Sequence, residues 1–147
     1  NIHTLMRDIQ LPPELEVGEG YGKVSWSVRA IWENYAGWFH HSSTTELYPV
    51  PVRSVHGDLV ALAGGPDAVA QRARGKLSSG EPVEAIHLAE VALTAEPTNV
   101  PALEVMVAAH EQLERESENF WLTQWLRKQL ADLRSILEAA KTKENLP

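Results

Sequence analysis

Apolar residues recur at steps of three and four through most of the chain, which is the spacing of one face of an α-helix. In residues 120–140 the repeating residue is leucine, found at Leu122, Leu126, Leu130, Leu133 and Leu137. No segment shows a convincing alternation of apolar and polar residues, the pattern of a half-buried strand. The pattern therefore predicts an all-α protein, an antiparallel array of helices.

Proline, glycine and capping residues set the predicted bounds of these helices. Pro66 suits the first position of a helix, and Asn99 suits an N-cap. The predicted helices span residues 3–10, 23–38, 52–63, 67–77, 82–95, 101–114 and 120–140. Between them, residues 39–51 are expected to form a loop or extended arm, and residues 141–147 a polar tail that frays.

The helix predicted for residues 23–38 carries two apolar faces. Its main stripe, which we expect to hold it to its own domain, is Val24, Val28, Ile31, Tyr35 and Trp38. Trp26 falls on the opposite side with Ala30 and Gly37, small residues that would let another helix approach closely. A surface helix of a monomer needs only one apolar face. The second face therefore indicates a contact with another protein.

The aromatic residues around this helix extend the predicted contact. Three of the five tryptophans and all three tyrosines lie between Gly18 and Tyr48. Aromatic side chains bury large areas and dominate both cores and interfaces. The predicted interface residues are Tyr21, Trp26, Ala30, Gly37, Trp38, Phe39 and Tyr48. We expect Phe120, Trp121 and Trp125, in contrast, to close the core of the helical array.

Four residues in the middle of the chain match a repeat template. Ala73, Ala85, Ala92 and Pro97 stand at successive offsets of 12, 7 and 5 residues, with Gly80 at the turn between two helices. These are the offsets of a tetratricopeptide repeat, a pair of antiparallel helices with small residues where they cross. The spacing predicts a tetratricopeptide-like helix pair; an ordinary alanine-rich bundle is the alternative.

Composition narrows the possible functions. The net charge is -7, without a basic run, and this argues against binding nucleic acid. The absence of cysteine excludes thiolate catalysis and cysteine-ligated metals. No apolar run reaches the roughly 20 residues that span a bilayer. The length of 147 residues suits a single helical domain, divided into residues 1–51, 52–140 and the tail. The start without methionine suggests a fragment of a longer chain.

The polar residues form no evident catalytic or metal site. His40 and His41 are the only histidine cluster and lack a third ligand at helical spacing, so we predict no metal, cofactor or catalytic residues. His56 and His110 are expected at the edge of the core with one hydrogen bond each, and His87 on the polar side of its helix. Gly18, Gly20 and Gly22 are expected to be a flexible connector, because a phosphate-binding loop would follow a strand.

Several short motifs together resemble one family. They are Gly-Tyr-Gly at 20–22, Ala-Ile-Trp at 30–32, Tyr-Ala-Gly-Trp at 35–38 and Leu-Tyr-Pro-Val-Pro at 47–51. With the helical repeats that follow, residues 2–140 strongly resemble the dimerisation domain of the alkyl sulfatases. These are metallo-β-lactamase-fold hydrolases of alkyl sulfate esters.

The resemblance implies a non-catalytic domain that pairs two copies of the chain. The parent protein would then be a metal-dependent hydrolase of sulfate esters, with zinc in a separate catalytic domain that this chain lacks. A different hypothesis is a free-standing tetratricopeptide-like module that binds a peptide in the groove of residues 67–114. A third is a complete small enzyme, which would itself cleave a sulfate ester.

Overall fold

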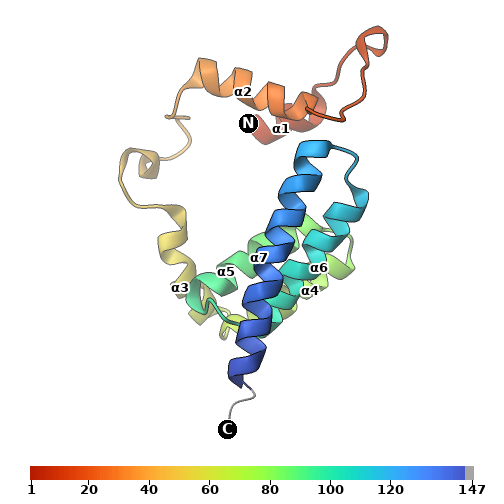
Figure 1. Cartoon of the computed structure of the whole chain (residues 1–147). Coiled ribbons are helices and arrows are strands. Elements are labelled where there is room, and N and C mark those ends of the chain that lie inside the picture. The colour runs from red at the N-terminus through yellow and green to blue at the C-terminus, as the bar shows by residue number, and fades with distance from the viewer. Residues whose placement is uncertain (145–147) are drawn as a thin grey trace. The chain divides into compact units, whose positions relative to one another are not determined.

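The computed structural model describes residues 1–144, and within them the chain is entirely helical, with no strand (Figure 1). The α-helices are α1 (Ile2–Asp8), α2 (Val24–Ala36), α3 (His56–Leu62), α4 (Pro66–Ser78), α5 (Pro82–Ala95), α6 (Val100–Glu116) and α7 (Phe120–Glu144). Short 3-10 turns occupy Pro13–Leu15, Thr44–Leu47 and Val52–Val55. The all-α prediction is confirmed.

The chain forms two compact units. Unit 1 consists of Asn1–Val50 together with Glu118–Trp121. Unit 2 consists of Pro51–Ser117 and the described residues from Leu122 onward. The return of residues 118–121 to unit 1 was not foreseen from the sequence. The single-domain organisation, divided at residues 51 and 140, stays a prediction.

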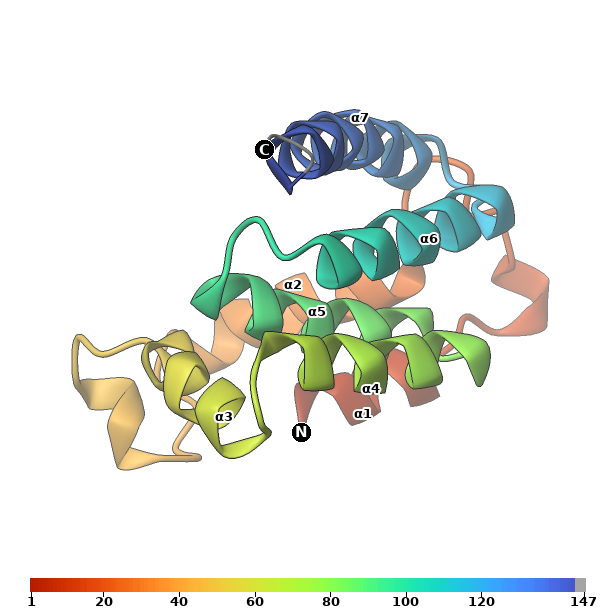
Figure 2. The ribbon, with the colours of Figure 1, turned by 90° about the horizontal axis from the view of Figure 1, so that it is seen from below.

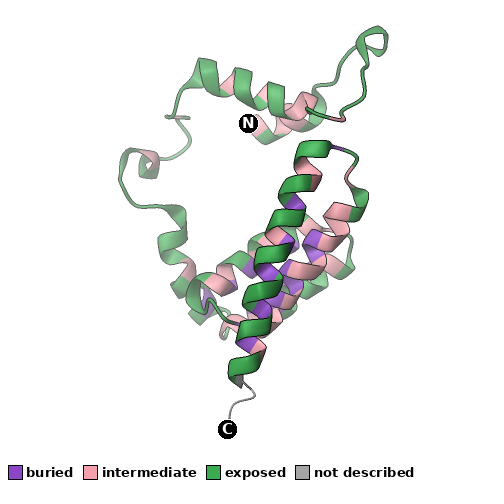
Figure 3. Cartoon of the chain, viewed as in Figure 1, coloured by how far each residue is buried: buried purple, intermediate pink, exposed green. Residues whose placement is uncertain are grey.

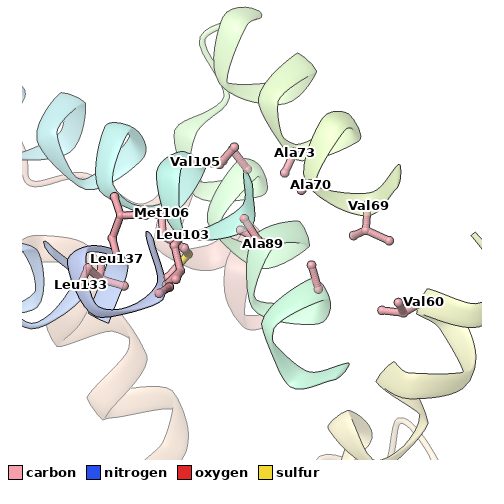
Figure 4. Close-up of a cluster of buried hydrophobic side chains, with 14 residues drawn as sticks. Val60, Val69, Ala70, Ala73, Ala89, Leu103, Val105, Met106, Leu133 and Leu137 are labelled. Carbon is pink, nitrogen blue, oxygen red and sulfur yellow. The ribbon is translucent and has the colours of Figure 1, made fainter. Parts of the chain in front are cut away.

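Alanine makes the close packing of unit 2 possible. Helices α4, α5 and α6 contact one another in succession, and α7 packs on the same apolar cluster (Figure 2). Ala73, Ala85 and Ala92 are fully buried where α4 and α5 meet their neighbours. Larger side chains from α6 and α7, including Leu103 and Leu137, complete the cluster (Figure 4). Small side chains at the crossings let the helix backbones approach, and the leucines fill the remaining space.

The α4–α5 pair has the geometry that the repeat pattern predicts. Only residues 79–81 separate the two helices, so these neighbouring helices run antiparallel. Gly80 in this turn has a φ of 78°, a left-handed conformation that suits glycine. Asn99 caps α6, as predicted, by accepting a hydrogen bond from the backbone N–H of Ala102 at 3.0 Å. Membership of the tetratricopeptide class itself stays a prediction.

Helix α7 packs on α6 through leucine side chains, and ion pairs flank this contact. Leu126, Leu130, Leu133 and Leu137 are buried, while Leu122 is half-buried. Arg127 pairs with Glu114 at 2.9 Å and Arg134 with Glu111 at 2.7 Å. The helix runs to Glu144, four residues beyond its predicted end; the predicted fraying of the tail stays a prediction, and positions 145–147 lie outside the described residues.

The apolar side predicted for residues 52–63 is also wrong. Val52, Val55, Leu59 and Leu62 are all exposed, and Val60 is the buried residue of α3. Helix α3 packs on α5 and places Val60 in the core cluster, so the side that carries Leu59 and Leu62 stays open. Val52 and Val55 lie in the 3-10 turn that precedes α3 and do not continue its helical face.

Unit 1 has a different character. Helix α1 packs on α2, yet none of residues 1–50 is buried. In Figure 3, which has the same view as Figure 1, helices α3 to α7 carry purple positions, whereas α1 and α2 are pink and green. A 50-residue segment rich in aromatic residues therefore builds no enclosed core within the single chain.

Candidate functional site

The aromatic residues of unit 1 form an exposed surface. Tyr21 and Trp38 are each 72% exposed, Tyr48 is similarly open, and Trp26 is 39% exposed. Ala30 and Gly37 are exposed as well, while Phe39 is half-buried. Six of the seven interface residues predicted from the sequence thus lie open on the single chain. Their role in an interface stays a proposal.

The main stripe of α2 does not hold the helix to its own domain, contrary to the sequence prediction. Ile31 and Trp38 are exposed, and Tyr35 is 87% exposed. Val24 and Val28 are only half-buried. The reason is the length of α1, the helix that packs on α2: its seven residues span about 10 Å, against about 20 Å for the 13 residues of α2. Both faces of α2 are therefore open along much of its length.

Helix α2 also ends earlier than predicted. Gly37 takes a φ of 69°, which stops the helix after Ala36, so Trp38 lies outside it. Beyond this point the rings pack locally. The ring centroids of Trp32 and His40 are 4.8 Å apart, and those of Phe39 and His41 are 4.2 Å apart.

A single carboxylate holds the arm that follows. Glu46 accepts hydrogen bonds from the backbone N–H groups of His40 at 2.6 Å and of Ser42 and Ser43 at 3.0 Å each. These bonds, that from His40 first, lower the pKa of Glu46 below its ordinary value of 4.5. The charged carboxylate therefore fixes the loop between the aromatic helix and Tyr48.

The glycine loop at residues 18–22 is tied down, which corrects its prediction as a flexible connector. The side-chain amide of Asn119 donates to the carbonyl oxygens of Glu19 at 2.6 Å and Gly22 at 3.4 Å. The backbone N–H of Phe120 donates to the carbonyl oxygen of Gly20 at 2.6 Å. No local sequence pattern predicts this contact, because the partners lie about a hundred positions apart.

The loop in turn fixes the beginning of α2. A carboxylate oxygen of Glu19 accepts the backbone N–H of Val24 at 2.8 Å, which satisfies one free donor of the first helical turn. Gly18, Gly20 and Gly22 avoid left-handed backbone, and a Cβ on any of them would meet no atom within 4 Å. Within residues 1–144, neither a close neighbour nor a left-handed φ requires glycine at these three places.

The aromatic group at the start of α7 is exposed, contrary to its prediction as core. Trp121 and Trp125 are 60% and 59% exposed, and Phe120 is exposed as well. The leucine stripe of α7 already fills the contact with α6, so these rings project from the other side of the helix. Phe120 packs on Tyr21, with the ring centroids 5.6 Å apart.

The histidines occupy the positions expected from the sequence. His110 is buried and donates through Nδ1 to the carbonyl oxygen of Met106 at 2.7 Å. His56 is half-buried with its Nδ1 3.3 Å from the hydroxyl of Thr94, and His87 is exposed. Within residues 1–144, no three histidine, aspartate or glutamate side chains gather closely enough to hold a metal ion. Nor does this part contain a helix long and apolar enough to cross a membrane.

A family model described as alkyl sulfatase dimerisation matches residues 1–135. The chain belongs to the alkyl sulfatase dimerisation family. This confirms the resemblance carried by the glycine-tyrosine-glycine loop, the aromatic helix and the Leu-Tyr-Pro-Val-Pro segment.

Curated relatives of this dimerisation-family chain are alkylsulfatases. It is 29% identical over 123 residues to an (R)-specific secondary-alkylsulfatase of Pseudomonas sp., covering 80% of this chain and 18% of that protein. It is 29% identical over 139 residues to a linear primary-alkylsulfatase of Pseudomonas sp., covering 91% of this chain and 26% of that protein. An alkyl/aryl-sulfatase of Saccharomyces cerevisiae is 30% identical over 115 residues, with 78% and 18% covered. The chain thus spans about a fifth to a quarter of the length of these proteins.

Solved structures show the same fold. A double mutant of the sec-alkyl sulfatase PisA1 superimposes with a TM-score of 0.76 at 26% identity, over 92% of this chain and 22% of that chain. The stereoselective inverting sec-alkylsulfatase Pisa1 from Pseudomonas sp. gives a TM-score of 0.73 at 25% identity, over 99% and 22%. The helical architecture of both units is therefore that of a region within a larger alkylsulfatase.

Proposed function

We propose that this chain is the dimerisation region of an alkyl sulfatase and that unit 1 supplies the contact between subunits. The observation that carries the proposal is the burial pattern: none of residues 1–50 is buried, although this segment holds three tryptophans and all the tyrosines. Large exposed apolar patches mark interaction sites. The family match identifies the second copy of the chain as the partner.

The seven predicted residues form the centre of the proposed contact. Tyrosine and tryptophan are enriched among the anchors of interfaces because they combine a large apolar area with few rotatable bonds. Trp38 and Tyr21 leave most of their area open, and Trp26 is 39% exposed one helical turn before the small residue Ala30. Burial of these rings against a second copy would remove the largest exposed aromatic area of unit 1 from water.

The competing hypothesis of a peptide-binding module has less support. It needs an open groove along the helices of residues 67–114. The family match over residues 1–135 favours a dimerisation region instead. Under the peptide-binding hypothesis, the exposed apolar area of residues 1–50, the aromatic segment, would also have no role.

The parent protein, by this proposal, hydrolyses sulfate esters through a catalytic domain outside this chain. The relatives carry alkylsulfatase names, and the matched region covers only 18% of one and 26% of the other. The resemblance implies a zinc site in the parent protein. The residues of this chain do not fit such a site, because no three potential ligands gather within residues 1–144. We therefore assign no catalytic step to this chain.

Sedimentation velocity of the 147-residue chain tests the dimer directly. At about 50 µM we expect a particle of twice the chain mass. Trp38→Ala and Trp26→Ala should each raise the dimer Kd at least tenfold, because truncating an anchor commonly costs more than about 1.4 kcal/mol. Leu62→Ala, which removes an exposed side chain of unit 2, should leave the Kd unchanged. A monomer at this concentration would contradict the proposal.

Hydrolysis assays test whether the catalytic activity of the parent protein lies outside this chain. The full-length parent should cleave a long-chain alkyl sulfate and carry zinc. The 147-residue chain alone should release no sulfate from this substrate and should contain no zinc by elemental analysis. Sulfate release by the isolated chain would show that it is itself an enzyme.

A further inference from the structure

We infer that the turn at residues 118–121 is part of the subunit interface and that Trp121 contacts the second copy of the chain. This rests on the proposed function and extends the surface beyond the seven residues predicted from the sequence. The turn comprises the last two residues of the α6–α7 connection and the first two residues of α7, and both of its chain neighbours, Ser117 and Leu122, belong to unit 2. Residues 118–121 themselves group with the aromatic segment.

Hydrogen bonds fix the turn to the glycine loop. The amide of Asn119, with 2% of the residue exposed, reaches the carbonyl oxygens of Glu19 and Gly22, and the backbone N–H of Phe120 reaches that of Gly20. A buried amide that lost these acceptors would carry an unsatisfied polar group, at a cost of about 1–3 kcal/mol. The position of the turn in unit 1 is therefore well determined.

The turn adds a continuous row of rings to the proposed surface. Tyr21, already a predicted interface residue, packs on Phe120 with a centroid separation of 5.6 Å. Phe120 packs edge-on against Trp121 at 5.3 Å, with the ring planes at 77°. All three remain exposed on the single chain. Rings already fixed by their neighbours lose little conformational entropy on binding, which favours them as anchors.

The area that a dimer needs points the same way. At roughly 200 Å² for each fully buried aromatic side chain, the four exposed aromatic residues of the proposed surface offer roughly 500 Å². A stable interface takes about 800 Å² from each partner. Phe120 and Trp121 contribute about 200 Å² more by the same measure. The surface must extend past the predicted residues, and the contact between Tyr21 and Phe120 shows one direction in which it continues.

Trp125 provides a matched control. It lies one turn further along α7, is exposed to the same degree as Trp121, and belongs to unit 2. Its ring faces the Lys128 ammonium group at 5.7 Å rather than another aromatic ring. The same substitution at the two tryptophans therefore separates a contact with the second copy from a general loss of exposed apolar area.

Sedimentation equilibrium of the full 147-residue chain and its variants tests the inference. Trp121→Ala should raise the dimer Kd at least tenfold, while Trp125→Ala should change it less than threefold. Trp38→Ala serves as the reference for the proposed function. An unchanged Kd for Trp121→Ala beside a weakened Trp38→Ala would overturn the inference and leave the proposed function standing. If the unsubstituted 147-residue chain stays monomeric at about 50 µM, both the inference and the proposed function are overturned.

A second measurement avoids reliance on truncation. The chain labelled with 5-fluorotryptophan gives one fluorine resonance for each tryptophan, and the Trp121→Ala and Trp125→Ala spectra assign two of them. The Trp121 resonance should shift with protein concentration across the monomer–dimer range, while that of Trp125 stays fixed. A Trp121 resonance that does not respond to dimer formation would also overturn the inference.

Discussion

The side-chain amide of Asn119 donates a 2.6 Å hydrogen bond to the backbone carbonyl oxygen of Glu19, joining residues 100 positions apart. The Glu19 carboxylate in turn accepts the backbone N–H of Val24 at the start of α2. One buried amide thus connects the α6–α7 turn, the glycine loop and the aromatic helix. The order of this part of unit 1 depends on a donor that points at two carbonyl oxygens.

Replacing that donor should release the loop. Asn119→Asp keeps the shape but turns a carboxylate toward the carbonyl oxygens of Glu19 and Gly22, which repel it. We expect the amide hydrogens of Val24 and Phe120 to exchange with solvent at least tenfold faster, measured by NMR, because an uncompensated polar contact costs about 1–3 kcal/mol. Gln124→Glu adds the same charge at an exposed position of α7 and should leave both rates unchanged. Equal exchange rates in Asn119→Asp and in the unsubstituted chain would show that the amide does not hold the loop.

The leucine at the centre of unit 2 should dominate its stability. Leu103 is 1% exposed, so Leu103→Ala should lower the free energy of unfolding by about 2–5 kcal/mol through lost burial and the cavity left behind. The same change at Leu62, 85% exposed, should stay within about 0.5 kcal/mol. Urea unfolding followed by circular dichroism measures both. Similar losses for the two variants would contradict the core as described.

The alanine crossings should not tolerate larger side chains. Ala89 of α5 is fully buried, so Ala89→Leu must push neighbouring helices apart and should cost at least about 1–3 kcal/mol. Ala61→Leu makes the same change on an exposed position of α3 and serves as the control. A lowered melting temperature for Ala89→Leu alone, by calorimetry, is the expected result. An unchanged melting temperature would mean that the helices do not meet at this residue.

Acid should loosen the arm through Glu46. Its pKa in the folded chain lies below the ordinary value of 4.5, because three backbone N–H groups bind the charged carboxylate. The stabilisation is complete above 4.5 and is lost as the pH falls through the lower folded-state pKa. An NMR titration should show the amide signals of Ser42 and Ser43 moving together with the Glu46 carboxyl. In Glu46→Gln this transition should be absent, and its persistence would assign it to another group.

Local signals account for what the sequence predicted well. Helix α5 has the predicted bounds, Pro82–Ala95, because proline at a first turn is a short-range signal. Asn99 acts as the predicted cap for the same reason. The buried alanines were also foreseen, since small residues at helix crossings follow a fixed spacing.

Contacts between distant residues, and apolar faces that the single chain leaves open, account for what was missed. Asn119 has no local pattern, because its acceptors lie in the glycine loop. Tyr35 lies in a helical stripe that resembles a core-facing one, but α1 is too short to cover it. Periodicity identifies an apolar face without saying whether its own chain or another covers it. The apolar positions of α7 likewise predict Trp121 and Trp125 as core, but the single chain leaves both exposed.

The two-segment composition of unit 1 has a consequence for its synthesis. Residues 51–117 separate the aromatic segment from the turn that completes the unit. At roughly 5–20 residues per second, the ribosome takes several seconds to make that stretch. During this interval the glycine loop lacks its hydrogen-bond donors and Tyr21 lacks its ring partner. If the proposed surface is the subunit contact, pairing of nascent chains through the complete surface waits until residue 121 has emerged, after α2 has been translated.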